Sequence, residues 1–180
     1  FDTKNLPSKM NVFSEHSENF KCNFIDLINP KISFDFLGGL YLSIFRRELW
    51  TQNIDKLSKK DMQDNLQFSN FNNTFPHITI FSYAFSNSKA YFYSNPMTVN
   101  LYGVREWTSL YPIVRSIRLP EATEIYLKNG LSFKNYLICK NYSLMYFIPD
   151  IVKLIINWKI SYRYFGKIII FYLKNFYFPN

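Results

Sequence analysis

The chain has 180 residues, of which 48% are apolar and 19% are charged. It is long enough for one globular domain with its own core and too short for two ordinary domains. Aromatic residues make up 20% of it and it holds only 5 Gly and 8 Pro, which excludes disordered, collagen-like and low-complexity chains. Its two cysteines, Cys22 and Cys139, form no CxxC pair, so the sequence favours a reducing compartment and predicts neither a disulfide framework nor a metal site.

The formal net charge of +8 is concentrated in the C-terminal part of the chain. Residues 1–106 carry 11 Lys and Arg against 10 Asp and Glu, whereas residues 107–180 carry 10 against 3. A basic region of this kind is typical of proteins that bind an anionic membrane or a nucleic acid.

The first third of the chain is predicted to contain helices and strands. Apolar residues at helical spacing predict an amphipathic helix over residues 14–28, which an Asn-Pro pair ends. Alternation of apolar and polar residues predicts a half-buried strand over residues 31–36. A Gly-Gly pair follows, and the apolar run over residues 40–45 predicts a second strand. The pattern then becomes helical from residue 46 to about residue 57.

The middle of the chain begins with a polar segment. Residues 58–74 are rich in Asn, Ser, Asp and Lys, which predicts a surface connection. Pro76 suits the first turn of a helix, and residues 89–93 have the pattern of a strand. A further helix is predicted to open at Pro120 and to end at Gly130.

The last part of the chain is basic and aromatic. Residues 133–178 hold 14 aromatic residues interleaved with Lys and Arg, and Asp150 is the one acid among them. Residues 144–158 and 164–178 are predicted to be helices that lie against another surface, because Lys and Arg separate their apolar stripes. No window has about 18 uninterrupted apolar residues, so a membrane-spanning helix is not expected.

Two of these segments resemble family 2 glycosyltransferases. Ser43-Ile-Phe-Arg-Arg-Glu-Leu-Trp50 is similar to the family's strand-to-helix step, and Ala90-Tyr-Phe-Tyr-Ser-Asn-Pro96 is similar to a later strand. The resemblance covers residues 31–107. It implies an α/β fold, namely an incomplete GT-A-like mixed sheet flanked by helices. We therefore expect residues 1–107 to form the acceptor-side part of a glycosyltransferase-like domain and residues 108–180 to form a basic, aromatic helical region.

The resemblance also implies an activity, which is transfer of a sugar from a nucleotide-sugar donor to a lipid-linked saccharide acceptor in bacterial surface polysaccharide synthesis. In the family, the N-terminal half binds the nucleotide, and an Asp-x-Asp motif there holds a divalent cation, Mg or Mn. This chain contains no Asp-x-Asp. We therefore expect the nucleotide-binding half and the cation ligands to lie before Phe1, and the isolated chain to be inactive. The implied location is cytoplasmic, peripheral on the inner face of the membrane.

The candidate catalytic residue is His77. In the family, an Asp at the start of the helix after the loop deprotonates the acceptor hydroxyl, and Pro76 and His77 stand at the matching positions here. A neutral imidazole, with an ordinary pKa of about 6.5, can accept a proton at cytoplasmic pH. The alternative is a hydrogen-bonded histidine that only supports the helix start.

Four residues are candidates for binding substrate. Arg46 and Arg47 follow an apolar run and suit a phosphate, although pairing with Glu48 or Asp35 is the favoured alternative. Arg105 and Trp107 follow Gly103, which permits a tight turn, and they suit a phosphate and a sugar ring. The alternative for these two is a surface pair between Arg105 and Glu106, with Trp107 in the core.

The chain has a second arginine pair, and two other classes of function remain open for it. Arg115 and Arg118 are three residues apart, which predicts a solvated helix face. A nucleic-acid-binding protein is one alternative function, but the chain has no recognised binding module, and we expect no nucleic-acid partner. A non-catalytic, membrane-associated scaffold is the other alternative.

Overall fold

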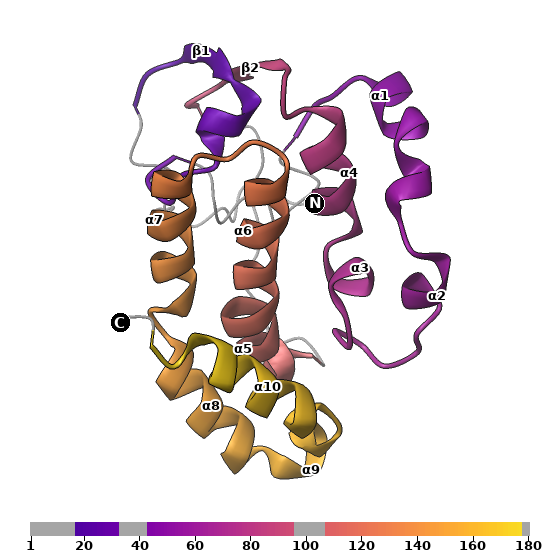
Figure 1. Cartoon of the computed structure of the whole chain (residues 1–180), viewed down its shortest axis with the longest axis vertical. Coiled ribbons are helices and arrows are strands. Elements are labelled where there is room, and N and C mark those ends of the chain that lie inside the picture. The colour runs from indigo at the N-terminus through magenta and orange to yellow at the C-terminus, as the bar shows by residue number, and fades with distance from the viewer. Residues whose placement is uncertain (1–16, 33–42, 96–106, 178–180) are drawn as a thin grey trace, which may run out of the picture.

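The computed structural model describes residues 17–32, 43–95 and 107–177, and helices dominate this part of the chain (Figure 1). The α-helices are α1 Arg47–Gln52, α2 Lys59–Met62, α3 Phe71–Thr74, α4 Pro76–Ala84, α5 Tyr111–Ile113, α6 Leu119–Lys128, α7 Phe133–Leu144, α8 Phe147–Ile156, α9 Trp158–Ser161 and α10 Phe165–Asn175. The shorter elements are the 3₁₀ turns η2 Phe24–Leu27, η5 Ile54–Lys56, η6 Thr108–Leu110 and η8 Tyr162–Tyr164, and the π-helix η7 Val114–Arg118.

Two short strands form an antiparallel sheet at one end of the molecule. β1 (Phe20–Asn23) pairs with β2 (Lys89–Phe92), and the rings of Phe20 and Phe92 stack at 5.1 Å. The prediction of a strand over residues 89–93 is confirmed. The prediction of a helix over residues 14–28 is wrong for the described residues from Phe20 onward. The apolar spacing that suggested a helix is produced by a strand followed by the turn η2, and pairing with β2 decides the conformation.

A mixture of helices and strands is confirmed, and the larger sheet is not found among the described residues. Lys31 and Ile32 lie in a turn, and residues 43–46 have no regular secondary structure. The rest of the two predicted strands, residues 33–42, lies outside the described residues. The β1–β2 pair is the one sheet in the part of the chain that the structure describes. The GT-A-like sheet therefore stays a prediction, as do the domain limits at residues 1–107 and 108–180.

The helices around residues 46–84 follow the sequence closely. α1 and η5 occupy the segment predicted to be helical up to about residue 57. α4 begins at Pro76, which gives up no intrahelical hydrogen bond at this position. The prediction that residues 58–74 form a surface connection is only partly right. The segment contains the short helices α2 and α3, and Ser69 within it is fully buried.

The first hydrophobic core joins α4 to the neighbouring helices α6 and α7, which lie side by side in Figure 1. Gly130 lies just beyond the cap of α6 with a φ of +110°, a backbone conformation that favours glycine and ends the helix as predicted. The core draws on residues from both sides of residue 107, which are Ile28, Phe75, Ile78, Val114, Leu119, Ala122, Tyr126, Leu131, Tyr136 and Cys139.

The second hydrophobic core lies at the opposite end of the molecule from the sheet. It packs α5 and η7 against α8 and α10 (Figure 1). Its buried residues are Leu110, Ile113, Ile117, Leu144, Phe147, Leu154, Tyr164, Ile168 and Phe171. Helices in both predicted C-terminal segments are confirmed, with α8 and α10 as their main elements. Among the described residues, no helix combines the length and apolar character needed to cross a bilayer.

The predicted solvated face at Arg115 and Arg118 is wrong. The segment that carries them is wound as the π-helix η7, just before Pro120. Since a proline has no N–H, it cannot bond the Ser116 carbonyl as an α-helix would require, and the wider turn accommodates this. The Arg118 residue is only 4% exposed, and the Arg115 side chain is 27% exposed. Both guanidinium groups bond to distant parts of the chain.

Candidate functional site

The two segments around the predicted site residues, α1 and α4, lie side by side (Figure 1). Phe45, just before α1, contacts the ring of Phe81 on α4 at 5.0 Å, and Trp50 on α1 contacts the same ring at 6.1 Å. Phe45 and Trp50 also stack on one another at 5.5 Å. An aromatic cluster therefore holds the arginine-bearing step against the helix that carries His77.

His77 is placed in the first turn of α4 and is mostly buried. Its imidazole lies between the rings of Phe75 and Phe81, each 5.9 Å from it, and the residue is only 7% exposed. A general base must come within hydrogen-bonding reach of the proton that it removes. The base role of His77 stays a prediction, and its burial limits how a sugar hydroxyl can approach it.

The predicted substrate-binding residues do not all come together. Arg46 is the residue just before α1 and Arg47 is its first residue, and both are exposed. Neither guanidinium pairs with Glu48 or another described carboxylate. Arg105 lies outside the described residues. Trp107 contacts the rings of Phe68 and Tyr111 at 5.7 and 6.1 Å, so it packs beside the connection and η6.

The polar segment between α2 and α4 forms a hydrogen-bonded network that the sequence did not predict. On α4, the Thr79 hydroxyl donates to the Asn72 side chain at 3.1 Å. The Asn72 amide in turn donates to Oδ2 of Asp61 at 3.1 Å. The Asn70 amide donates to the Asp61 carbonyl at 3.0 Å. Through Asn72 of α3, this network links α2 and its carboxylate to the first turn of α4.

Asp61 has the geometry of an oriented carboxylate. The residue is half-buried, its Oδ2 is held by the Asn72 amide, and its Oδ1 has no hydrogen-bond partner in the part of the chain that the structure describes. A free oxygen on a fixed carboxylate can accept a hydrogen bond from a hydroxyl group of a ligand. The sequence did offer a signal, because Asp61 and Asp64 stand three residues apart just before the Asn-rich run.

Asp64 serves a different purpose in the same segment. It accepts hydrogen bonds from the Ser69 hydroxyl and, at 2.9 Å, from the Leu66 N–H. Those two hydrogen bonds, the Ser69 bond first, lower the pKa of the Asp64 carboxyl below its ordinary value. Asn70 and Asn73 cap α3 reciprocally. Asp64 is therefore a structural acceptor that shapes the turn.

Side chains from the C-terminal part bind the carbonyl groups of the same turn. Arg118 donates to the carbonyls of Phe68, at 3.1 Å, and Ser69, at 2.7 Å. Tyr164 donates to the Gln67 carbonyl and Lys167 to the Ser69 carbonyl. Phe68 has a φ of +57°, which is rare for a residue with a side chain. Five hydrogen bonds from these three side chains hold the turn in place.

Metal and cysteine chemistry find little support among the described residues. No group of three or more His, Cys, Asp or Glu side chains is placed there to hold a metal ion. The divalent cation that the resemblance implies therefore has no ligand set in this part of the chain. Burial raises the pKa of the Cys139 thiol to about 12, which disfavours its reactive thiolate form.

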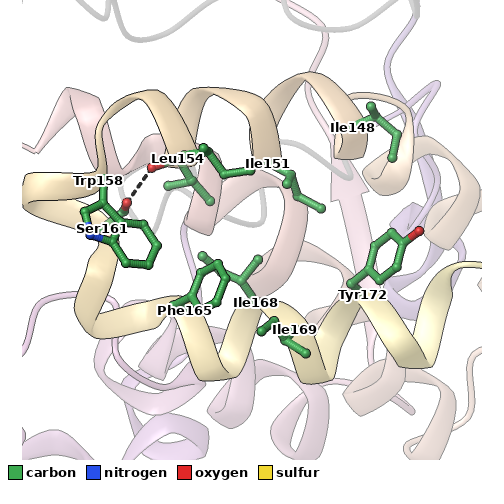
Figure 2. A pocket seen from close by; sticks show the side chains of 10 residues that line it. Ile148, Ile151, Leu154, Trp158, Ser161, Phe165, Ile168, Ile169 and Tyr172 are labelled. Atoms are coloured by element: carbon green, nitrogen blue, oxygen red, sulfur yellow. Dashed lines mark hydrogen bonds between the residues drawn. The ribbon is translucent and has the colours of Figure 1, made fainter.

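Two hollows lie near the C-terminal helices. One is an apolar groove of about 230 Å³ between α8 and α10 (Figure 2). The other, of about 390 Å³, lies between the polar turn at Leu66 and Gln67 and the basic residues Lys159 and Arg163. The polar turn therefore borders one hollow, and the C-terminal helices line both.

Comparison of the chain with protein-family models, with curated proteins and with solved structures finds no match in any of the three. The resemblance to family 2 glycosyltransferases thus rests on the sequence segments described above.

Proposed function

We propose that the chain is the acceptor-side part of a glycosyltransferase, which transfers a sugar from a nucleotide-sugar donor to a lipid-linked saccharide acceptor. One observation carries the proposal. The segment that resembles the family's strand-to-helix step packs against α4, and the half-buried carboxylate of Asp61 is linked to α4 through the side chain of Asn72. That is the region in which the family resemblance calls for a base.

A sugar hydroxyl is a poor nucleophile until its proton is removed, so transfer needs a base close to the acceptor. Asp61 presents an oxygen free of described partners, whereas His77 is nearly enclosed by aromatic rings. We therefore assign the base role first to Asp61 and second to His77. Arg46 and Arg47 are exposed at the start of α1, and we propose that they bind the phosphates of donor or acceptor.

The proposal also includes a nucleotide-binding half and the residues that bind the divalent cation. We expect both to be encoded upstream of Phe1. The coding sequence upstream of Phe1 tests this expectation directly. An Asp-x-Asp motif preceded by strand–helix repeats would support the proposal. A complete gene without them would leave a scaffold as the function.

The experiment uses the complete polypeptide as its gene encodes it. Transfer of labelled sugar from a panel of nucleotide sugars to a lipid-diphosphate acceptor is measured for Asp61→Asn, His77→Ala and Asp55→Asn. Loss of a general base costs about 100-fold or more in turnover. We expect that loss for Asp61→Asn. Asp55 is exposed, and among the described residues its one ion pair is with its neighbour Lys56, so Asp55→Asn is the matched control.

A non-catalytic scaffold at a membrane is the second candidate. The observation that favours it is the large exposed apolar surface of α8 and α10.

Normal transfer by all three variants would remove Asp61 and His77 from the mechanism. Failure of the complete polypeptide to transfer any sugar would favour the scaffold.

A further inference from the structure

The outer surface of the α8–α10 hairpin is unusually apolar. Six residues that line the groove between the two helices are 39–55% exposed, although each is a large apolar or aromatic residue. They are Ile148, Ile155, Trp158, Phe165, Ile169 and Tyr172. They recur at helical spacing, so each helix presents one apolar stripe. We call these six residues the apolar face.

The groove beneath this face is suited to a hydrocarbon chain. Leu154 and Ile168 form buried parts of its lining, and the rings of Trp158 and Phe165 meet at 4.9 Å (Figure 2). The Ser161 hydroxyl donates its hydrogen bond to the Leu154 carbonyl at 2.5 Å, so it has no proton left to donate to a ligand in the groove. The volume of about 230 Å³ exceeds the roughly 150 Å³ of an apolar cavity that takes up benzene, and it is smaller than the roughly 300 Å³ at which pockets for drug-sized ligands begin.

The exposed charged residues of the hairpin have one sign. Between residues 145 and 177 the exposed charged residues are all basic, namely Lys153, Lys159, Arg163, Lys167 and Lys174. The one acid in this range, Asp150, is fully buried and bonds to Arg115. Helices that carry an apolar stripe with Trp and Tyr, and whose exposed charges are all Lys and Arg, have the pattern of helices that lie in the interface of an anionic membrane.

We infer that the α8–α10 hairpin docks on an anionic phospholipid bilayer, with the apolar face turned to the lipid and one acyl chain reaching into the groove. A second copy of the chain is a poor partner for this surface, because two such basic surfaces placed face to face would bring like charges together. Since no described helix can span a bilayer, the hairpin lies along the surface. The inference goes beyond the proposed transferase and does not rest on it, because vesicle binding requires no sugar.

The test is flotation of the chain with vesicles of phosphatidylcholine alone or with about 30% phosphatidylglycerol. We expect binding to the anionic vesicles at low salt and a strong decrease as salt rises, because salt screens exposed charges. Replacing Lys159 by Ala should weaken binding about fivefold, the effect of one basic residue at an anionic surface. Quenching of Trp158 fluorescence by brominated lipid, absent in Trp158→Phe, reports insertion of the face itself.

The decisive variants place a charge beside the apolar face at exposed positions. Ile156 and Leu173 are 76% and 60% exposed, so Ile156→Glu with Leu173→Glu should leave the fold intact and reduce vesicle binding more than about tenfold. Ile44→Glu is the matched control, because Ile44 is 93% exposed and lies outside the hairpin. Equal binding by the double variant and the control would overturn the inference. So would a dimer in sedimentation that the double variant abolishes, since the face would then belong to a second copy.

Discussion

Asp150 on α8 holds the guanidinium of Arg115, although 35 residues separate them in the chain. The carboxylate is fully buried, and Nε and Nη2 of Arg115 donate to its two oxygens at 2.9 and 2.5 Å. The hydroxyl of Ser116 donates to it at 2.5 Å. These bonds tie the π-helix η7 to α8, and the hydrogen bond to Asp150 raises the pKa of Arg115. The pair therefore anchors the C-terminal hairpin to the rest of the molecule.

Removing the Asp150 charge should destabilise the protein strongly. Asp150→Asn keeps the size of the side chain and leaves Arg115 without its counter-charge, which costs about 3 kcal/mol in the free energy of unfolding. Urea denaturation measures this change. Asp55→Asn, at an exposed pair, should cost less than about 0.5 kcal/mol. Equal effects of the two substitutions would show that the buried pair contributes no more to the free energy of unfolding than the exposed pair.

Arg118 should control the order of the polar turn at residues 66–70. Its guanidinium donates to two carbonyls of that turn and to Glu121. Arg118→Met removes these donors at similar length and should cost about 3 kcal/mol of stability, because a buried set of hydrogen bonds is lost. Hydrogen exchange measures the opening, which should be greatest at residues 66–70. Arg163→Met, at an exposed arginine, is the control and should leave exchange there unchanged.

The carboxyl group of Asp64 should titrate below the ordinary Asp value of about 3.9. Because its pKa is lower in the folded state, it stabilises the fold above that value, and the contribution is lost as the pH falls through the folded pKa. Carbon NMR of the side chain follows the titration directly. Ser69→Ala removes the largest cause of the lowered pKa, so the midpoint should rise. A midpoint unmoved by Ser69→Ala would contradict the assigned cause.

Two glycines should respond in opposite directions to the same substitution. Gly130 has a φ of +110°, so Gly130→Ala should destabilise the protein by about 1 kcal/mol. Gly166 lies inside α10 with open space around the position of a Cβ atom, so Gly166→Ala should stabilise it by up to about 1 kcal/mol. Thermal unfolding of the two variants separates these effects by sign. Destabilisation by Gly166→Ala would show that α10 does not extend through this position.

Local signals predicted the central helices well. Pro76 marked the start of α4, and Gly130 marked the end of α6, because a proline and a left-handed glycine each act on the backbone where they stand. β1 could not be predicted in this way. Its conformation depends on pairing with β2, whose residues lie about 70 positions later in the chain, as with Phe20 and Phe92.

The candidate site was only partly predictable for a related reason. The sequence placed His77 in the first turn of α4, but its enclosure by Phe75 and Phe81 depends on three-dimensional packing. Polar composition suggested an exposed connection over residues 58–74, whereas distant donors such as Arg118 bury part of it. Spacing alone gave no sign that Arg118 would bond to backbone carbonyls 49 and 50 residues away.

The most direct test of the central claim is sugar transfer by the complete polypeptide to two acceptors, one a lipid-linked saccharide in anionic vesicles and the other a water-soluble saccharide. We expect the unaltered protein to transfer to both. Ile156→Glu with Leu173→Glu should slow transfer to the vesicle acceptor alone, and Asp61→Asn should slow transfer to both about 100-fold or more. Absence of transfer from every nucleotide sugar to either acceptor would contradict the assignment as a glycosyltransferase.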